Sequence, residues 1–180
     1  MRTRPIPFLA SPLCSQVLSS CRWISASLMA LLLGLSAPAS ADQIDIQVEI
    51  PALKVDPYHR PFVAAWIETP KRKGVATLTV MFDDAEWLKD LRQWWRKQGR
   101  RMKDVDAVSA ATRKPGPHRI QWNASGLPDG EYMLCLEAAR EAGGREFIRI
   151  PIQLGASEPQ THQAQGKNEL GHITVQISPK

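Results

Sequence analysis

The segment at residues 43–50 restricts the fold of this chain most, because polar and apolar residues alternate strictly along it. Ile44, Ile46, Val48 and Ile50 therefore share one face of an extended strand. Further strand-like runs occupy 61–69, 75–82, 118–124, 131–140, 145–154 and 172–177. Turn-forming residues separate several of these runs, and Pro151 favours an edge strand or a bulge. The pattern predicts an all-β chain folded as an antiparallel β-sandwich, with the polar stretch 157–167 as a loop.

The segment from Glu86 to Arg100 follows a different period. Its apolar residues recur at helical spacing: Trp87, Leu88, Leu91, Trp94 and Trp95. They fit one face of an amphipathic helix ending near Gly99, inserted between the strand-forming halves. The opposite face carries a narrow basic stripe: Lys89, Arg92 and Arg96. That stripe is typical of a solvated helix face, and it also suits weak docking to an anionic partner or to lipid headgroups.

The first 41 residues have the pattern of a secretory signal. Three arginines and no acidic residue precede Asp42, and an apolar run from Trp23 to Leu35 leads to Ala39 and Ala41. The small-x-small spacing of these alanines favours cleavage after Ala41. The run is shorter than the roughly 20 residues of a membrane span, so we expect a periplasmic domain at 42–180 that is not itself transmembrane.

Removal of the signal changes what composition implies. The three arginines leave with it, so the formal net charge falls from +5 to +2. The basic balance is therefore no indication of nucleic-acid binding. Cys14 and Cys21 also leave, and Cys135 remains in a strand-like run, where we expect a buried and unreactive thiol.

The usual sequence patterns of enzymes do not occur in this chain. Its four histidines are scattered, without the spacing of metal ligands, and no nucleophile elbow, phosphate-binding glycine loop or haem-attachment motif is present. Asp83, Asp84 and Glu86 form an acidic cluster that the start of the predicted helix explains without a metal. A redox carrier or a binding protein is favoured over a stand-alone enzyme.

Two segments remain as candidate sites. In the first, Tyr58, His59 and Arg60 lie between two prolines, and they either form a rigid strand entry or meet a planar or anionic ligand. In the second, residues 104–117, small side chains precede Thr112 and Arg113. This segment is either a solvated loop or a short recognition sequence in which the Thr112 hydroxyl is presented uncrowded at the surface.

A resemblance bears on the second segment. Asp106-Ala107-Val108-Ser109-Ala110-Ala111-Thr112 resembles the Asp-x-x-Ser/Thr-Gly-Ala-Ser/Thr motif of exported proteins that carry a covalent flavin. The matching residues are Asp106, Ser109, Ala111 and Thr112, and Ala110 replaces the usual glycine. In those proteins a flavin transferase, using FAD and magnesium, joins FMN to the hydroxyl of the final threonine by a phosphoester bond.

The wider chain resembles the domain of unknown function 2271, a family of predicted periplasmic proteins. The resembling stretches include Pro57–Glu68, Trp87–Arg100, Asp106–Gly116 and Leu127–Glu146. The resemblance implies an immunoglobulin-like sandwich. It also implies association with flavin transferases and with membrane proteins that contain PepSY domains.

These observations support two main hypotheses. The first is a periplasmic electron carrier with FMN on Thr112, in which Arg113 and Arg60 lie near the phosphate, and Tyr58, His59 or Trp122 packs against the flavin ring. A PepSY-type membrane reductase would supply the electrons. The second is a periplasmic adaptor or binding module without a cofactor, which uses exposed sheet edges. A third, weaker option is a small-molecule or haem-binding protein with His59 as the ligand.

Overall fold

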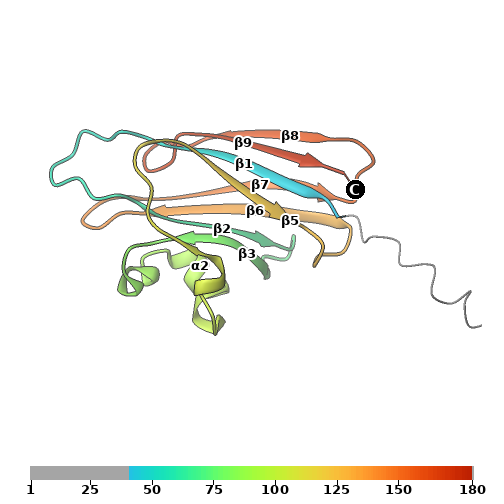
Figure 1. The fold of residues 1–180 in the computed structure, drawn as a ribbon, viewed down its shortest axis with the longest axis horizontal. Coiled ribbons are helices and arrows are strands. Elements are labelled where there is room, and N and C mark those ends of the chain that lie inside the picture. Colours follow the sequence, from blue (N-terminus) through green and yellow to red (C-terminus); the bar gives the residue numbers. More distant parts are fainter. Residues whose placement is uncertain (1–40, 180) are drawn as a thin grey trace, which may run out of the picture. The chain divides into compact units, whose positions relative to one another are not determined.

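The computed structural model describes residues 41–179, so the predicted signal segment lies outside the described residues except for Ala41. Two sheets pack face to face, which confirms the all-β sandwich (Figure 1). The first, sheet A, contains in spatial order β5 (Gly116–Asn123), β1 (Gln43–Ile50), β9 (His172–Ser178) and β8 (Gln160–Gln165). The second, sheet B, contains β4 (Ser109–Ala110), β3 (Gly74–Met81), β2 (Phe62–Glu68), β6 (Gly130–Ala139) and β7 (Arg145–Leu154). Neighbouring strands are antiparallel except for the parallel pair of β3 and β4.

The inner core lies between the two sheets. The alternation of β1 is reproduced, because Ile44, Ile46, Val48 and Ile50 are all buried in it. Alternate residues of β9 lie beside them in sheet A, and alternate residues of β6 face them from sheet B, as expected for strands with one apolar face. The sandwich therefore rests on an apolar layer against which, of the candidate residues, only Ala110 and Trp122 pack.

A second core covers the outer face of sheet B. Three short helical elements lie against this face: η1 (Ala85–Lys89), α2 (Arg92–Lys97) and η2 (Gly99–Arg101) (Figure 1). Leu88, Leu91 and Trp94 pack against Trp66 and its neighbours in this cluster. Strand β2 is consequently buried on both faces, which explains its continuous run of buried residues.

The prediction of one continuous helix over this segment is wrong. The chain leaves helical geometry at Leu91, whose φ and ψ are −75° and 67°, and α2 begins afresh at Arg92. In an unbroken helix the N–H groups of Gln93 and Trp94 would bond to carbonyls four residues earlier. Here they donate to the carboxylate of Glu137 on β6, at 2.9 Å each. The break lets both Trp87 and Trp94 contact the sheet, from η1 and α2 respectively.

Two further predictions about the strands have different outcomes. The edge position of Pro151 is confirmed, because β7 is an outer strand of sheet B. The predicted loop at 157–167 is wrong, since most of it forms β8, paired with β9. The side chains of β8 are mostly polar, and its pairing uses backbone groups that require no apolar side chain.

Four segments leave sheet B at the same end. Phe62 of β2 pairs with Ala139 of β6, Val63 pairs with Met81 of β3, and Met81 pairs with Ala110 of β4. The strand ends are thus aligned, and the segments 58–61, 82–84, 111–114 and 140–144 emerge together. We call this the site end of sheet B, because it gathers most of the predicted site residues. Among the described residues, no helix is long and apolar enough to cross a membrane.

Candidate functional site

The segment 104–112 is folded rather than an irregular connection. The carboxylate of Asp104 accepts hydrogen bonds from the N–H groups of Asp106 and Ala107, at 3.1 and 3.3 Å, and starts the turn η3 (Asp106–Val108). The hydroxyl of Ser109 donates to the carbonyl of Asp106 at 3.1 Å. The Ser109–Ala110 strand then pairs with the end of β3. The Ser109 side chain and the backbone of Asp106 therefore help to shape the turn that leads to Thr112, together with the carboxylate of Asp104.

The hydroxyl of Thr112 occupies a defined position. Thr112 is 5% exposed, and its Oγ1 donates a hydrogen bond of 2.5 Å to Oδ1 of Asp83. The expectation of an uncrowded surface hydroxyl is therefore wrong, because the carboxylate beyond the end of β3 holds the side chain inward. The environment is still polar and close to solvent, since Ala111, Arg113 and Asp83 are exposed. Thr112 lies between β4 and β5, outside any regular strand.

The methyl group of Ala110 is accommodated without backbone strain. Ala110 lies in β4 in an extended conformation, and it is not among the described residues with positive φ. Its side chain packs against the inner core. Because the conformation at this position is one that any residue adopts, glycine is not required there to form the turn.

The residues of the 57–61 segment lie at the site end but have their own partners. The Nδ1 atom of His59 is 3.2 Å from a carboxylate oxygen of Glu141. The hydroxyl of Tyr58 is buried and has no hydrogen-bond partner among the described residues. Arg60 is exposed, and no hydrogen bond or ion pair joins it to Thr112 within residues 41–179. Trp122, by contrast, lies near the end of β5 that is opposite to Gly116, and it pairs with Ile44 of β1.

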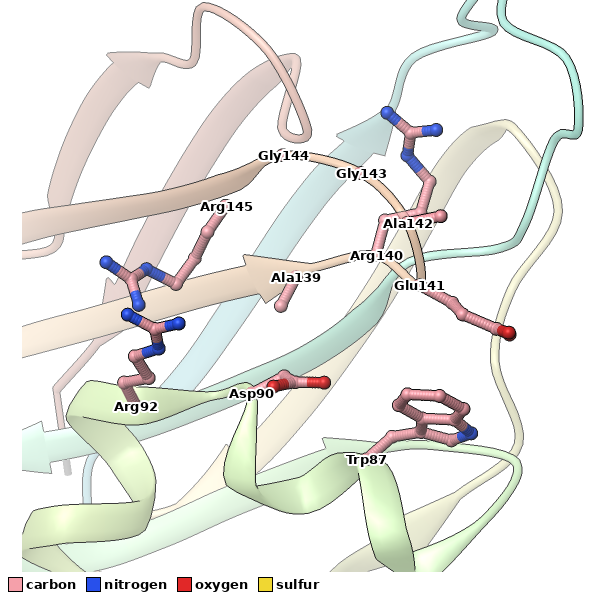
Figure 2. A pocket seen from close by; sticks show the side chains of 10 residues that line it. All are labelled: Trp87, Asp90, Arg92, Ala139, Arg140, Glu141, Ala142, Gly143, Gly144 and Arg145. Carbon is pink, nitrogen blue, oxygen red and sulfur yellow. The ribbon is translucent and has the colours of Figure 1, made fainter.

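A hollow of about 430 Å³ lies beside these segments, and Figure 2 shows the side chains around it. Trp87, Asp90 and Arg92 line one side, and the turn from Ala139 to Arg145 lines the other. The Trp87 ring stacks on Phe62 with 5.8 Å between centroids. The hollow is of the size that small-molecule sites have. Residues 139–145 were not predicted as part of a site, because their position beside the helical segment depends on the order of the strands.

The turn that lines the hollow is fixed by a buried ion pair. Nη2 of Arg140 lies 3.0 Å from Oε1 of Glu169, Nε lies 3.0 Å from Oε2, and the Gly144 N–H donates to Oε1 at 3.1 Å. The hydrogen bond from Glu169 raises the pKa of Arg140, and Tyr58 adds a smaller electrostatic effect in the same direction. Arg140 is therefore committed to a structural contact.

A buried carboxylate holds the other wall of the hollow. Glu137 is fully buried, accepts the N–H groups of Gln93 and Trp94, and lies 3.9 Å from Nε of Arg145. Burial raises the pKa of Glu137, although its hydrogen bonds from the backbone and the nearby arginines act in the opposite direction. This carboxylate starts α2 and thereby sets the position of Arg92.

The remaining chemical groups give less sign of a reactive site. Cys135 is buried, as predicted, and burial and the nearby Glu68 raise the pKa of its thiol to about 12. Asp84 accepts the N–H of Glu86 at 3.0 Å and caps η1, so the helix start accounts for this part of the acidic cluster. Within residues 41–179, no group of three or more His, Cys, Asp and Glu side chains is arranged to hold a metal ion.

The fold and this arrangement define an all-β sandwich protein with one elaborated sheet end. A family model described as "Predicted periplasmic protein (DUF2271)" matches residues 43–172, which include sheet B, the site end and all of sheet A except β9 beyond its first residue. The chain therefore belongs to the family of domain of unknown function 2271. A search of curated proteins and a search of solved structures found no match.

Proposed function

We propose that this protein is a periplasmic electron carrier that bears FMN on Thr112. The single observation that carries the proposal is the placement of Thr112 at the end of a folded turn, outside the strands, with exposed residues on both sides. The carboxylate of Asp104, the backbone of Asp106 and the hydroxyl of Ser109 make the hydrogen bonds of that turn. The motif is thus a compact surface element that a second enzyme can recognise.

The attachment step is a phosphoryl transfer. Oγ1 of Thr112 attacks the FMN phosphorus of FAD, the pyrophosphate bond breaks, and AMP leaves. The hydroxyl proton passes to a base of the transferase. The hydrogen bond to Asp83 opens first in this scheme, because Thr112 is only 5% exposed and has to turn outward to reach phosphorus, and because the carboxylate repels the incoming phosphate. Opening costs on the order of 2 kcal/mol, the usual contribution of one hydrogen bond to a charged acceptor.

The site end has features that suit an attached flavin. Asp83 and Trp87 lie four positions apart, so at most roughly 14 Å of extended chain separates their Cα atoms. Because Thr112 is hydrogen bonded to Asp83, its anchor lies on the same side of the fold as the Trp87 segment. Aromatic rings stack favourably on planar systems. The protein's role would be to position the ring and exclude water from one of its faces, while bound FMN supplies the one- and two-electron chemistry. A PepSY-type membrane reductase is the proposed donor.

The test is co-expression with a periplasmic flavin transferase, followed by intact-mass measurement and a visible spectrum. The expected product is yellow and heavier than the unmodified chain by one FMN less one water. Thr112→Ala should abolish the mass increase and leave the protein folded, with a loss of stability of about 2 kcal/mol, because it removes the single hydrogen bond to Asp83. Thr112→Ser, which retains the hydroxyl, should be modified.

Two further variants examine the local geometry. Asp83→Asn removes the competing charge and should speed modification, measured as the fraction of flavinylated chain against time. Ala110→Gly restores the usual motif residue and serves as a matched positive control. If wild type and Ala110→Gly both stay colourless beside a transferase that modifies a reference substrate, the flavin proposal is wrong. The adaptor role, with the open edge of β8 as the binding surface, would then be the better description.

A further inference from the structure

A second hollow adjoins the first and is unusually rich in cations. It measures about 340 Å³ and is lined by Lys89, Arg92, Gln93, Trp95, Arg96 and Arg145. Arg92 and Arg145 also line the first hollow, so the two hollows meet at this pair. No acidic side chain is among the residues that line the second hollow. We call this surface the paired-arginine groove.

The two arginines come from different elements and converge. Arg92 begins α2 and Arg145 begins β7, and Figure 2 shows their guanidinium groups pointing toward one another. Like charges held close together repel unless an anion lies between them. The carboxylate of Glu137 is 3.9 Å from Arg145, but it is fully buried and already accepts two backbone N–H groups. Within residues 41–179, Arg92 forms no ion pair with a carboxylate.

The arrangement differs from an ordinary solvated helix face. A solvated face needs cations on one helix only, whereas Arg145 reaches the groove from the sheet. Arg96 is also fixed, because its guanidinium donates to the side-chain oxygen of Gln93 at 2.8 Å and to the carbonyl of Arg92 at 3.2 Å. The Arg96 guanidinium is therefore oriented before any ligand arrives, which lowers the entropy lost on binding at this edge of the groove.

We propose that the paired-arginine groove binds the phosphate group of an organic phosphate, with Arg92 and Arg145 donating to its oxygens. Planar guanidinium groups suit phosphate because each donates two parallel hydrogen bonds. The half-buried Trp95 provides an apolar surface for the remainder of the ligand on one side. On the other side, the carboxylate of Asp90 lines the first hollow and can accept hydrogen bonds from hydroxyl groups. This site does not depend on modification of Thr112.

The experiment titrates the unmodified protein with phenyl phosphate and with inorganic phosphate, followed by tryptophan fluorescence and by calorimetry. A parallel arm measures sedimentation with vesicles of phosphatidylcholine, with and without phosphatidylglycerol. The test variant is Arg92→Gln/Arg145→Gln, and Arg92→Gln alone serves as a second variant because Arg92 is exposed and contacts no buried charge. The matched control is Lys71→Gln/Lys73→Gln, which removes two exposed cations from the turn between β2 and β3.

We expect saturable binding of the soluble phosphates. The affinity should fall at least about tenfold in the arginine variants and stay unchanged in the lysine control. Tighter binding of phenyl phosphate than of inorganic phosphate would support the role of Trp95. Vesicle binding that is lost only in the arginine variants would also support the site and would assign its phosphate to a lipid headgroup. No binding of phenyl phosphate, inorganic phosphate or the anionic vesicles would overturn the proposal. An equal loss of binding in the arginine variants and in the lysine control would also overturn it.

Discussion

The ion pair of Arg140 and Glu169 offers a quantitative test of how the site end is held. It connects the turn between β6 and β7 to the loop before β9, and so joins the two sheets at this end. The side chains are 7% and 2% exposed, and their contact uses two nitrogens and two oxygens. Glu169→Leu would leave the guanidinium buried without its carboxylate and would deprive the Gly144 N–H of an acceptor.

The expected loss follows from these contacts. Removing one partner of a buried ion pair costs about 3–5 kcal/mol, and the lower end applies because this pair lies in loops rather than in the inner core. The unsatisfied Gly144 N–H adds about 1 kcal/mol. The total of about 4 kcal/mol corresponds to a fall in melting temperature of roughly 15 °C for a domain of this size. Urea denaturation followed by tryptophan fluorescence measures it directly.

The double variant Arg140→Met/Glu169→Leu separates the pair from general packing. Replacing both charges with apolar groups removes the uncompensated guanidinium, so the double variant should be more stable than Glu169→Leu alone. A loss below about 1 kcal/mol in the single variant would refute the reasoning. So would a double variant whose loss equals the sum of the two single losses.

Two acidic residues should give pH-dependent stability of opposite sign. Burial raises the pKa of Glu137 in the folded state, so the native protein takes up a proton before the unfolded chain does as the pH falls. Wild type should therefore gain stability relative to Glu137→Gln as the pH falls from neutral to 4.5, the ordinary pKa of a glutamate. Urea midpoints for both proteins across that range measure the difference. The pKa of Glu146 is lowered, because N–H groups of Lys167, Leu170 and Asn168 outweigh the effect of burial. Glu146→Gln should therefore lose about 2 kcal/mol at neutral pH, and the loss should shrink as the pH falls below 4.5, which acid titration of the unfolding free energy checks.

The strands were predictable where side-chain patterns alone determine them. The period of two along β1 identified its buried face, and Pro151 marked an edge strand. Strand β8 was missed because its polar side chains carry no such pattern, and its position comes from backbone pairing with β9. The break in the helical segment was missed for a different reason. Glu137 competes for the N–H groups of Gln93 and Trp94 from more than forty residues away, and no local pattern contains that contact.

The candidate site was predictable only in part, for the same physical reason. The motif around Thr112 is local, and the sequence identified its hydroxyl as the group of interest. The partner of that hydroxyl, Asp83, became apparent only once β4 was seen beside β3 in parallel. The position of Arg145 opposite Arg92 likewise depends on β7 following β6 at the edge of sheet B. Such contacts depend on which strands are neighbours in the sheet, and neither composition nor the period of apolar residues determines that order.

The site end can change without disturbing the sandwich, because the two rest on different forces. Buried apolar side chains between the sheets hold the inner core, and the strength of that contribution grows with the area buried. Hydrogen bonds and ion pairs instead hold the emerging segments, as with Thr112 and Asp83, His59 and Glu141, or Glu137 and the start of α2. The contacts of Thr112 and of His59 are single polar contacts, each of which opens for at most a few kcal/mol. A transferase can therefore lift Thr112 from Asp83 while the strands on either side keep their pairing. Attachment and folding are then separable steps: the Thr112→Ala variant addresses attachment, and the Glu169→Leu variant addresses folding.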